Sequence, residues 1–492
     1  MRDRPGGVRG RLGYYYAPMS TASELPSLRL DAGREQALER AAAIVARAWQ
    51  SFDNARPGQP GVDERLHALL RAALPGDGSS ALAALDDAAQ LLDVSIAQPR
   101  PRFFAFVGSS GLEIGVLGDL LASCFDVNLA VWAGAASEVE DQAVRWVSEF
   151  VGFPAAAGAF TSGGTISNVT ALAAARERAL PGSRREGMTG ARAALYCSQE
   201  AHYSVVRAAE LLGIGSDHVR SLEMDDARRL RPDAVDAAIE ADRAAGVTPV
   251  AVVATAGTTL TGAVDAIDPL ADVCEERGVW LHVDGAYGVA AATTPSAGHL
   301  FAGLDRADSV TLDAHKWLFL PKACGVVLVR RHEDLHGALA HEEDYIPHER
   351  PDHHMVDITL EYSRPFRALK VWLAFRAHGA EAIRAAIERN LGQARLLHTE
   401  VARRDELEHL CGEPQLSIVP FRHVPAGISE AELDDHNARL VEELQQQGDV
   451  WVAPARVDGK VCLRPCVVNY RTTDDDVRAF VEAVLEVGRD LR

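Results

Sequence analysis

Five short apolar runs, separated by helical segments, constrain the fold of this chain more than any other feature of its sequence. The runs are Ala193–Cys197, Pro249–Ala254, Val279–Val283, Val310–Leu312 and Gly325–Val329. Several are apolar at every position rather than at alternate ones, as expected for strands that helices cover on both faces. Strands that alternate with helices are typical of an α/β domain with a largely parallel sheet. We therefore predict such a domain beyond Pro99 and Pro101.

Helical patterns precede this domain, and a mixed pattern follows it. Apolar residues recur at helical spacing over residues 31–52, 64–74 and 81–93. After Val371 we expect a long helix to Leu397, a helix over 430–446, a last helix from Asp474 and strand-like stretches between them. The chain is thus expected to comprise a flexible N-terminal extension, an N-terminal helical segment, a large α/β domain and a small C-terminal α+β domain, over residues 1–28, 29–112, 113–372 and 373–492.

Charge and composition exclude several classes of partner. The net charge of −20 argues against nucleic acid or an anionic membrane as a general partner. No apolar run approaches the roughly 20 residues of a membrane span. The seven cysteines show no paired framework and no CxxC motif, which favours a reducing compartment. We expect a soluble, cytoplasmic protein.

One lysine lies in an otherwise largely apolar stretch of the sequence. Residues 309–320 read SVTLDAHKWLFL, so Lys316 has apolar neighbours on both sides. An ammonium group in such surroundings is paired, extends its head group to water or takes part in amine chemistry. The lysine alone does not separate these three interpretations.

Two turns of the chain are rich in glycine and threonine. Residues 160–168 read FTSGGTISN and open an amphipathic helix, and residues 255–259 read TAGTT directly after a strand. Amide groups at the start of a helix bind anions, and α/β sheets place ligands at the carboxyl ends of their strands. Neither turn has the pattern of a Walker loop or a GxGxxG motif, and each also suits a purely structural helix start.

Two further polar residues occupy similar positions. Asp284 ends the apolar strand of VWLHVDGAYG, and His202 opens the helix of QEAHYSVVRAAELLG. Either could simply cap a helix. Together with Lys316 and the anion-binding turns, however, they supply what pyridoxal 5′-phosphate (PLP) requires, namely a lysine for a Schiff base, a carboxylate for the pyridine nitrogen, a flat ring for stacking and amides for the phosphate.

These residues occur in stretches that resemble a known family. TSGGTISN, HYSVVRAAELLG, ATAGTTLTGAVDAID, WLHVDGAYG, DAHKWLFLPKACGVVLVR and SRPFRALKVW are similar to the PLP-dependent group II amino acid decarboxylases, which include the aromatic-L-amino-acid, glutamate and diaminobutyrate enzymes. The resemblance implies the type I, aminotransferase-like PLP fold, with a mostly parallel seven-stranded sheet, helices on both faces and a small C-terminal α+β domain. It also implies a homodimer whose N-terminal helices wrap the partner and whose active site lies near the interface.

The resemblance also implies roles for individual residues. Lys316 matches the Schiff-base lysine, Asp284 the partner of the pyridine nitrogen and His202 the stacking histidine. The remaining matches are Ala286 against the ring, His315 as a phosphate-contacting neighbour of the lysine, and Gly164, Thr165 and Thr259 at the phosphate. Tyr345 falls where the family carries, on a mobile loop, the tyrosine that protonates the substrate carbon after CO₂ leaves, and it favours the simple amine as product.

The loop that carries Tyr345 is rich in histidine. Residues 332–354 contain six of the 17 histidines, but their spacing fits no compact ligand set such as HExxH. We expect a solvated lid that closes over a small L-amino acid, and no metal.

Alternatives remain at the level of reaction and substrate. An aminotransferase on the same fold would use the same lysine and aspartate, with Arg464 as a candidate carboxylate-binding residue. A catalytically silent, PLP-binding dimer is a third interpretation. In RFFAFVGSSG, which corresponds to part of the family's substrate pocket, Gly108 and Ser109 stand where the animal aromatic enzymes have proline and threonine. We favour an aromatic substrate, with an acidic or diamino acid as the alternative.

Overall fold

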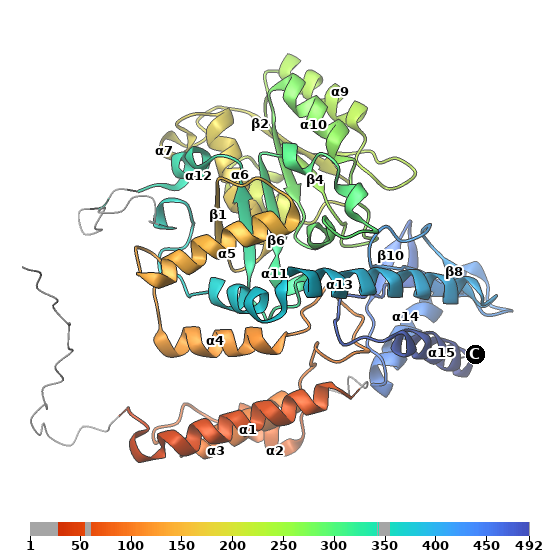
Figure 1. Cartoon of the computed structure of the whole chain (residues 1–492). Helices are drawn as coiled ribbons and strands as arrows, with labels where there is room; N and C mark the ends of the chain where they lie inside the picture. The colour runs from red at the N-terminus through yellow and green to blue at the C-terminus, as the bar shows by residue number, and fades with distance from the viewer. Residues whose placement is uncertain (1–27, 55–60, 342, 344–354, 492) are drawn as a thin grey trace, which may run out of the picture.

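A seven-stranded sheet forms the centre of the molecule. The computed structural model describes residues 28–54, 61–341, 343 and 355–491 (Figure 1). In spatial order the strands are β1 (Ala157–Thr161), β7 (Gly325–Val329), β6 (Ser309–Asp313), β5 (Trp280–Asp284), β4 (Thr248–Thr255), β2 (Ala193–Ser198) and β3 (Val219–Leu222). Only β7 runs antiparallel to its neighbours, and the other pairs are parallel. The predicted α/β class with a mostly parallel sheet is confirmed.

Helices cover both faces of this sheet, as the unbroken apolar strands predicted. On one face lie α6 (Gly164–Ala179), α8 (Ser204–Leu211) and α12 (His332–Leu339), with the short α7 (Ser183–Glu186) beside them. On the other lie α5 (Ala135–Val151), α9 (Pro232–Ala244) and α10 (Ile267–Arg277). Alternate strand residues enter the two cores, so that Val253 packs with the α6 side while Val252 and Ala254 pack with the α5 side.

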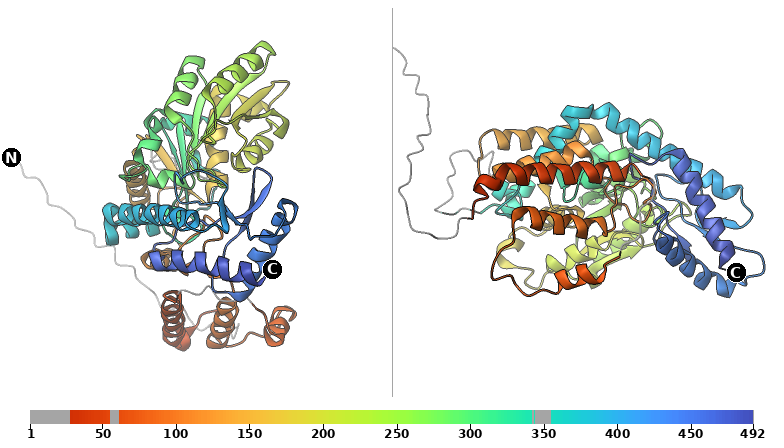
Figure 2. Two further views of the ribbon diagram at one scale, coloured as in Figure 1. Left: turned by 90° about the vertical axis from the view of Figure 1, so that its right-hand side faces the viewer. Right: turned by 90° about the horizontal axis from the view of Figure 1, so that it is seen from below.

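The N-terminal helices form a separate layer below α4 (Glu113–Phe125) (Figures 1 and 2). They are α1 (Arg34–Phe52), α2 (Glu64–Leu70) and α3 (Ala81–Asp93). The prediction for α2 extended to residue 74, but the helix ends four residues earlier. Residues 71–80 are all exposed, so no core is present on which a further turn could pack.

The C-terminal part is a small α+β unit, as predicted. The helix α13 (Ala368–Ala402) leads to an antiparallel sheet in the order β10 (Pro454–Val457), β11 (Lys460–Leu463), β9 (Phe421–His423) and β8 (Leu407–His409), which packs with α14 (Glu430–Gln447) and α15 (Asp474–Asp490). The helix α13 spans residue 372, where the boundary between the large and the small domain was predicted. The domain limits therefore stay a prediction.

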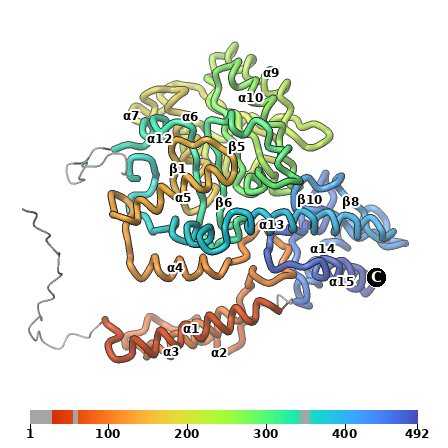
Figure 3. The backbone as a smooth tube through the Cα atoms, in the orientation of Figure 1, coloured from red at the N-terminus to blue at the C-terminus, as the bar shows by residue number. Residues whose placement is uncertain are grey.

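One segment ties this unit to the rest of the chain. Between α3 and α4 the backbone passes beside the C-terminal part (Figure 3), where Phe104 N donates to Trp451 O and Cys466 N donates to Phe104 O. The seven cysteines are all free. Within the described residues, no helix is both long and apolar enough to span a membrane.

Candidate active site

A cavity of about 290 Å³ opens at the carboxyl ends of the central strands. Thr255, Asp284 and Asp313, the last residues of β4, β5 and β6, all line it. The cavity also contains every predicted site residue that the structure describes, namely Gly164, Thr165, His202, Thr259, Asp284, Ala286, His315 and Lys316. Tyr345 lies outside the described residues, as does most of the predicted lid.

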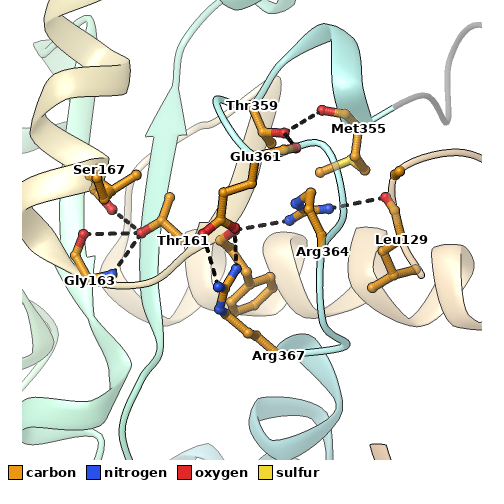
Figure 4. A network of polar contacts seen from close by, with 12 residues as sticks. Leu129, Thr161, Gly163, Ser167, Met355, Thr359, Glu361, Arg364 and Arg367 are labelled. Carbon is orange, nitrogen blue, oxygen red and sulfur yellow. Dashed lines mark hydrogen bonds and ion pairs between the residues drawn. The ribbon is translucent and has the colours of Figure 1, made fainter. Parts of the chain in front are cut away.

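The first helix of the site begins at the glycine turn. Thr161 Oγ1 accepts a hydrogen bond from Gly163 N at 3.2 Å and bonds Ser167 Oγ at 2.8 Å, which fixes the turn between β1 and α6 (Figure 4). A Cβ atom at Gly164 would lie 3.0 Å from Asp313 Oδ2 and 3.1 Å from the Ala286 side chain. Glycine therefore suits this position, because a larger residue would force Asp313 and Ala286 to shift.

A buried arginine supports the same turn from below. Arg364, in the stretch SRPFRALKVW, forms an ion pair with Glu140 at 2.6 Å, and each side chain is only 1% exposed. Arg364 also donates to the Phe160 carbonyl oxygen at 2.9 Å. A further bond, at 3.3 Å, joins it to the Leu129 carbonyl oxygen (Figure 4). Because Phe160 precedes Thr161, this arginine anchors the end of β1 that leads into the glycine turn.

Asp284 is a buried carboxylate that faces the cavity. Its Oδ2 accepts a hydrogen bond from Asn168 Nδ2 at 2.8 Å, and its Oδ1 accepts one from Ala286 N at 3.2 Å. Among the described residues, no basic side chain lies within ion-pair distance of it. A buried carboxylate requires cationic or donor partners, so a ligand that presents a protonated nitrogen would suit this position.

His202 lies on the other side of Asn168. Its Nδ1 lies 2.8 Å from Ser204 Oγ and accepts from Ser204 N at 3.3 Å. Burial lowers the pKa of His202, and the nearby Asp284 opposes this effect. The ring is therefore neutral at pH 7 and can present a flat, uncharged face to a ligand.

Lys316 sits on α11 (Ala314–Trp317), one turn beyond β6. Its Nζ lies 3.0 Å from Asp313 Oδ2, with the lysine side chain 23% exposed and the aspartate 3% exposed. Of the three interpretations of Lys316, the structure thus shows pairing with an acidic residue. This ion pair faces the cavity. The neighbouring His315 has its pKa lowered by burial, and its Nδ1 lies 3.1 Å from the Cys324 carbonyl oxygen.

Arg464 does not lie ready to bind a substrate carboxylate. Its guanidinium donates to the carbonyl oxygens of Thr259 and of Ala105, and the residue is 8% exposed. These contacts join three parts of the chain at the cavity wall. Two of its nitrogens thus bind the backbone at a buried position, so Arg464 gives no support to the aminotransferase alternative.

The polar groups of the cavity fit PLP. Thr255 Oγ1 and Asp313 Oδ1 are buried and have no hydrogen-bond partner in the described part of the chain, and Asp284 has none that is cationic. A ligand with a protonated ring nitrogen, a hydroxyl and a phosphate offers donors and acceptors to such groups. The amine of Lys316 lies in the same cavity.

Three buried residues of this region escaped the sequence analysis. Asp313 and Asn168 line the cavity, and Arg364 binds the end of β1 that leads into it. For Asp313 a signal was present. In WLHVD and SVTLD the polar residues stand at alternate positions, so a strand places Asp284 and Asp313 at the same end and on the same face.

Comparison with known proteins gives a consistent result. The family described as "Pyridoxal-dependent decarboxylase conserved domain" matches residues 63–424. The chain is 36% identical over 399 residues to an aromatic-L-amino-acid decarboxylase of Bacillus atrophaeus, covering 80% of this chain and 82% of the relative. It is 33% identical over 427 residues to an L-2,4-diaminobutyrate decarboxylase of Rhizobium meliloti, covering 85% and 84%.

The fold agrees with a solved structure as well. The crystal structure of Oryza sativa TDC with PLP and tryptamine superimposes with a TM-score of 0.88 at 27% identity, covering 95% of this chain and 99% of that one. The type I PLP fold is thus confirmed, as are PLP as the cofactor and amino acid decarboxylation as the reaction. The chain belongs to the family of pyridoxal-dependent amino acid decarboxylases.

Proposed function

We propose that this decarboxylase acts on aromatic L-amino acids and releases the corresponding amines and CO₂. The observation that carries the proposal is the similarity to the aromatic-L-amino-acid decarboxylase of Bacillus atrophaeus over four fifths of the chain. The segment that corresponds to part of the family's substrate pocket also offers an exposed aromatic side chain. Arg464 donates to the carbonyl oxygens of Thr259 and Ala105, and Phe106, the residue after Ala105, has half of its surface exposed.

Gly108 and Ser109, which replace the proline and threonine of the animal aromatic enzymes, are compatible with an aromatic substrate. Ser109 Oγ donates to the Leu320 carbonyl oxygen at 2.6 Å, and its N–H donates to Gln98 Oε1 at 3.2 Å. A Cβ atom at Gly108 would lie 2.8 Å from that same Gln98 oxygen. Both residues therefore serve the packing of the segment, and neither offers a charged group that would select an acidic or diamino side chain.

Each catalytic residue has a proposed role. Bound PLP supplies an electron-accepting ring that stabilises the charge left when CO₂ departs. Lys316 would hold the cofactor covalently and free the amine, and Asp284 would keep a proton on the ring nitrogen. The neutral His202 and Ala286 would contact the ring, while Gly164, Thr165, Thr259 and His315 would bind the phosphate.

We also propose that Tyr345 returns a proton to the substrate carbon. This role rests on its position in the sequence, 29 residues beyond Lys316, since Tyr345 lies outside the described residues. With Tyr345 as the donor, the product is the simple amine.

A panel of L-amino acids tests the substrate. We expect kcat/KM for tyrosine, tryptophan or 3,4-dihydroxyphenylalanine to exceed that for 2,4-diaminobutyrate and glutamate by at least about tenfold, because an apolar aromatic contact discriminates by that order. CO₂ and amine are measured together, with Lys316→Ala as the blank. Faster turnover of the diamino or acidic substrates would exclude the aromatic assignment, and release of a keto acid without CO₂ would exclude decarboxylation.

Apolar side chains are exposed on α1, α3 and α4, at the N-terminal helices and beside them. Leu38 on α1 is 60% exposed, Leu92 on α3 is 68% exposed, and Leu120 and Phe125 on α4 are 55% and 77% exposed. Patches of this kind mark interfaces. The layer of α1–α3 also stands apart from the sheet (Figure 2). We propose that a second copy of the chain covers these helices in a homodimer.

Light scattering tests the homodimer. The full chain is expected to have twice the mass of one chain, and the double variant Leu120→Asp/Phe125→Asp is expected to shift it to the monomer, because two buried carboxylates would cost several kcal/mol in an apolar interface. Leu211→Asp is the control, since Leu211 is 64% exposed on α8, away from these helices. A monomeric wild type, or dissociation by the control alone, would contradict the proposal.

A further inference from the structure

The strand that ends in Asp284 carries polar residues on one face along its whole length. Trp280, His282 and Asp284 stand at alternate positions of β5 and face α6, whereas Leu281 and Val283 pack into the core on the other side of the sheet. His282 is fully buried and does not line the cavity. A buried histidine behind the site calls for a physical explanation.

An unbroken line of hydrogen bonds runs through His282 to the site. Trp280 Nε1 donates to Ser309 Oγ at 2.8 Å, and Ser309 Oγ lies 2.8 Å from His282 Nδ1. His282 Nε2 lies 3.1 Å from Asn168 Oδ1, and Asn168 Nδ2 donates to Asp284 Oδ2 at 2.8 Å. Four buried side chains thus connect the start of β5 to the carboxylate at its end.

The carboxylate sets the direction of every bond in this line. As an anion Asp284 only accepts, so Asn168 must present its N–H₂ to Asp284 and its oxygen to His282. An oxygen at that position requires a proton on His282 Nε2. His282 Nδ1 is then an acceptor and takes the hydroxyl proton of Ser309, whose oxygen accepts from the indole N–H of Trp280.

The same amide also reaches the second residue that faces the cavity. The other hydrogen of Asn168 Nδ2 goes to Ser204 Oγ at 2.9 Å, and Ser204 Oγ lies 2.8 Å from His202 Nδ1. Ser204 accepts from Asn168 and therefore donates to His202. This leaves the proton of the neutral His202 on Nε2.

The charge state of His282 agrees with this arrangement. Burial lowers the pKa of His282 to about 4, against smaller opposing effects of the Asp284 charge and of the Ser309 backbone. The ring is neutral at pH 7, so Nδ1 is free to accept, as the bond from Ser309 requires.

We propose that His282 and Asn168 form a buried positioning relay that fixes both the carboxylate of Asp284 and the tautomer of His202 for cofactor binding. Neither residue of the relay takes part in the reaction: His282 does not line the cavity, and Asn168, which does, acts through its bonds to Asp284 and Ser204. The inference rests on the roles proposed above for Asp284 and His202. It does not depend on which amino acid is the substrate.

Neutron diffraction from crystals of the holoenzyme tests the relay without any substitution. We expect deuterium on Nε2 and none on Nδ1 in both His282 and His202, with the Asn168 amide nitrogen toward Asp284. Deuterium on Nδ1 of His282 would overturn the proposal, because the line of bonds would then run the other way.

The affinity of the apoenzyme for PLP tests whether the relay matters for cofactor binding. PLP is titrated into the full-length apoenzyme without amino acid, and binding is followed by cofactor absorbance. His282→Leu is expected to raise the dissociation constant about tenfold or more, since Asn168 Oδ1 loses its buried donor. His282→Gln, whose amide can donate from the place of Nε2, is expected to stay within about threefold of wild type.

Val283→Ala is the matched control, because Val283 is the next residue of β5, is equally buried and faces the other core. It should bind PLP within about threefold of wild type while losing stability. If His282→Leu binds PLP as tightly as wild type, or Val283→Ala weakens binding as much, the relay has no positioning role. If His282→Leu does not fold, Ser309→Ala is used in its place. The neutron diffraction result then still tests the direction of the hydrogen bonds in the relay. Neither readout involves turnover, so a failed substrate assignment would leave both intact.

Discussion

Lys316→Ala is expected to lower turnover by at least about 10³-fold and to abolish covalent attachment of the cofactor, because no other lysine among the described residues lines the cavity. The holoenzyme should lose the cofactor absorbance that borohydride reduction makes permanent. Turnover is measured as CO₂ release with the best substrate of the panel, and attachment as absorbance that survives denaturation after reduction.

The composition of the chain makes this experiment unusually discriminating. The sequence contains only four lysines. The other three each have a partner, since Lys322 donates to Gln98, Lys370 to Asp119 and Lys460 to Glu408. Peptide mapping of the reduced holoenzyme should place the cofactor on Lys316, and Lys460→Ala should behave as wild type. An active Lys316→Ala variant, or a label on another lysine, would falsify the assignment.

Arg364→Met is expected to lower the free energy of unfolding by about 3–5 kcal/mol, the usual effect of removing one partner of a buried ion pair. Methionine fills much of the volume, but Glu140 is left as a buried carboxylate at 1% exposure, and the carbonyl oxygens of Phe160 and Leu129 lose a donor. Denaturant unfolding followed by circular dichroism measures the change.

A neighbouring ion pair supplies the control for this effect. Arg367 pairs with Glu361, where the side chains are 12% and 28% exposed (Figure 4). Arg367→Met should cost about 1 kcal/mol or less, because water can replace the lost partner. The double variant Arg364→Met/Glu140→Leu should recover part of the stability lost in Arg364→Met. Equal losses in the two single variants would show that burial is not the cause.

The sequence predicted many of the helices and strands because these elements depend on local patterns of residues. The run Gly325–Val329 is β7 at both ends, and Ala81–Asp93 is α3 at both ends. Runs that are apolar throughout indicate strands covered on both faces, and the parallel strands β4, β5 and β6 then end at one edge of the sheet, whereas the reversed direction of β7 was not predicted. The cavity accordingly holds all the predicted site residues that the structure describes, although their individual roles stay predictions.

What the sequence did not predict depends on contacts between distant residues. Asn168 and Asp284 are 116 positions apart, and only the sheet order brings them together. β1 was not predicted either, because AGAFT has small residues where strand signals are usually β-branched or aromatic. Its glycine is required by packing, since a Cβ atom at Gly158 would lie 2.8 Å from both the Val144 side chain and the Val327 carbonyl oxygen.

The reversed direction of β7 has a consequence for Lys316. The chain leaves β6 at Asp313, forms α11 and returns at Gly325, and these two residues are partners in the β6–β7 pair. Lys316 therefore lies in a closed loop whose two ends are bonded to each other in the middle of the sheet. Because the sheet holds both ends of this loop, part of the entropy of placing the amine is lost when the protein folds rather than when the cofactor binds.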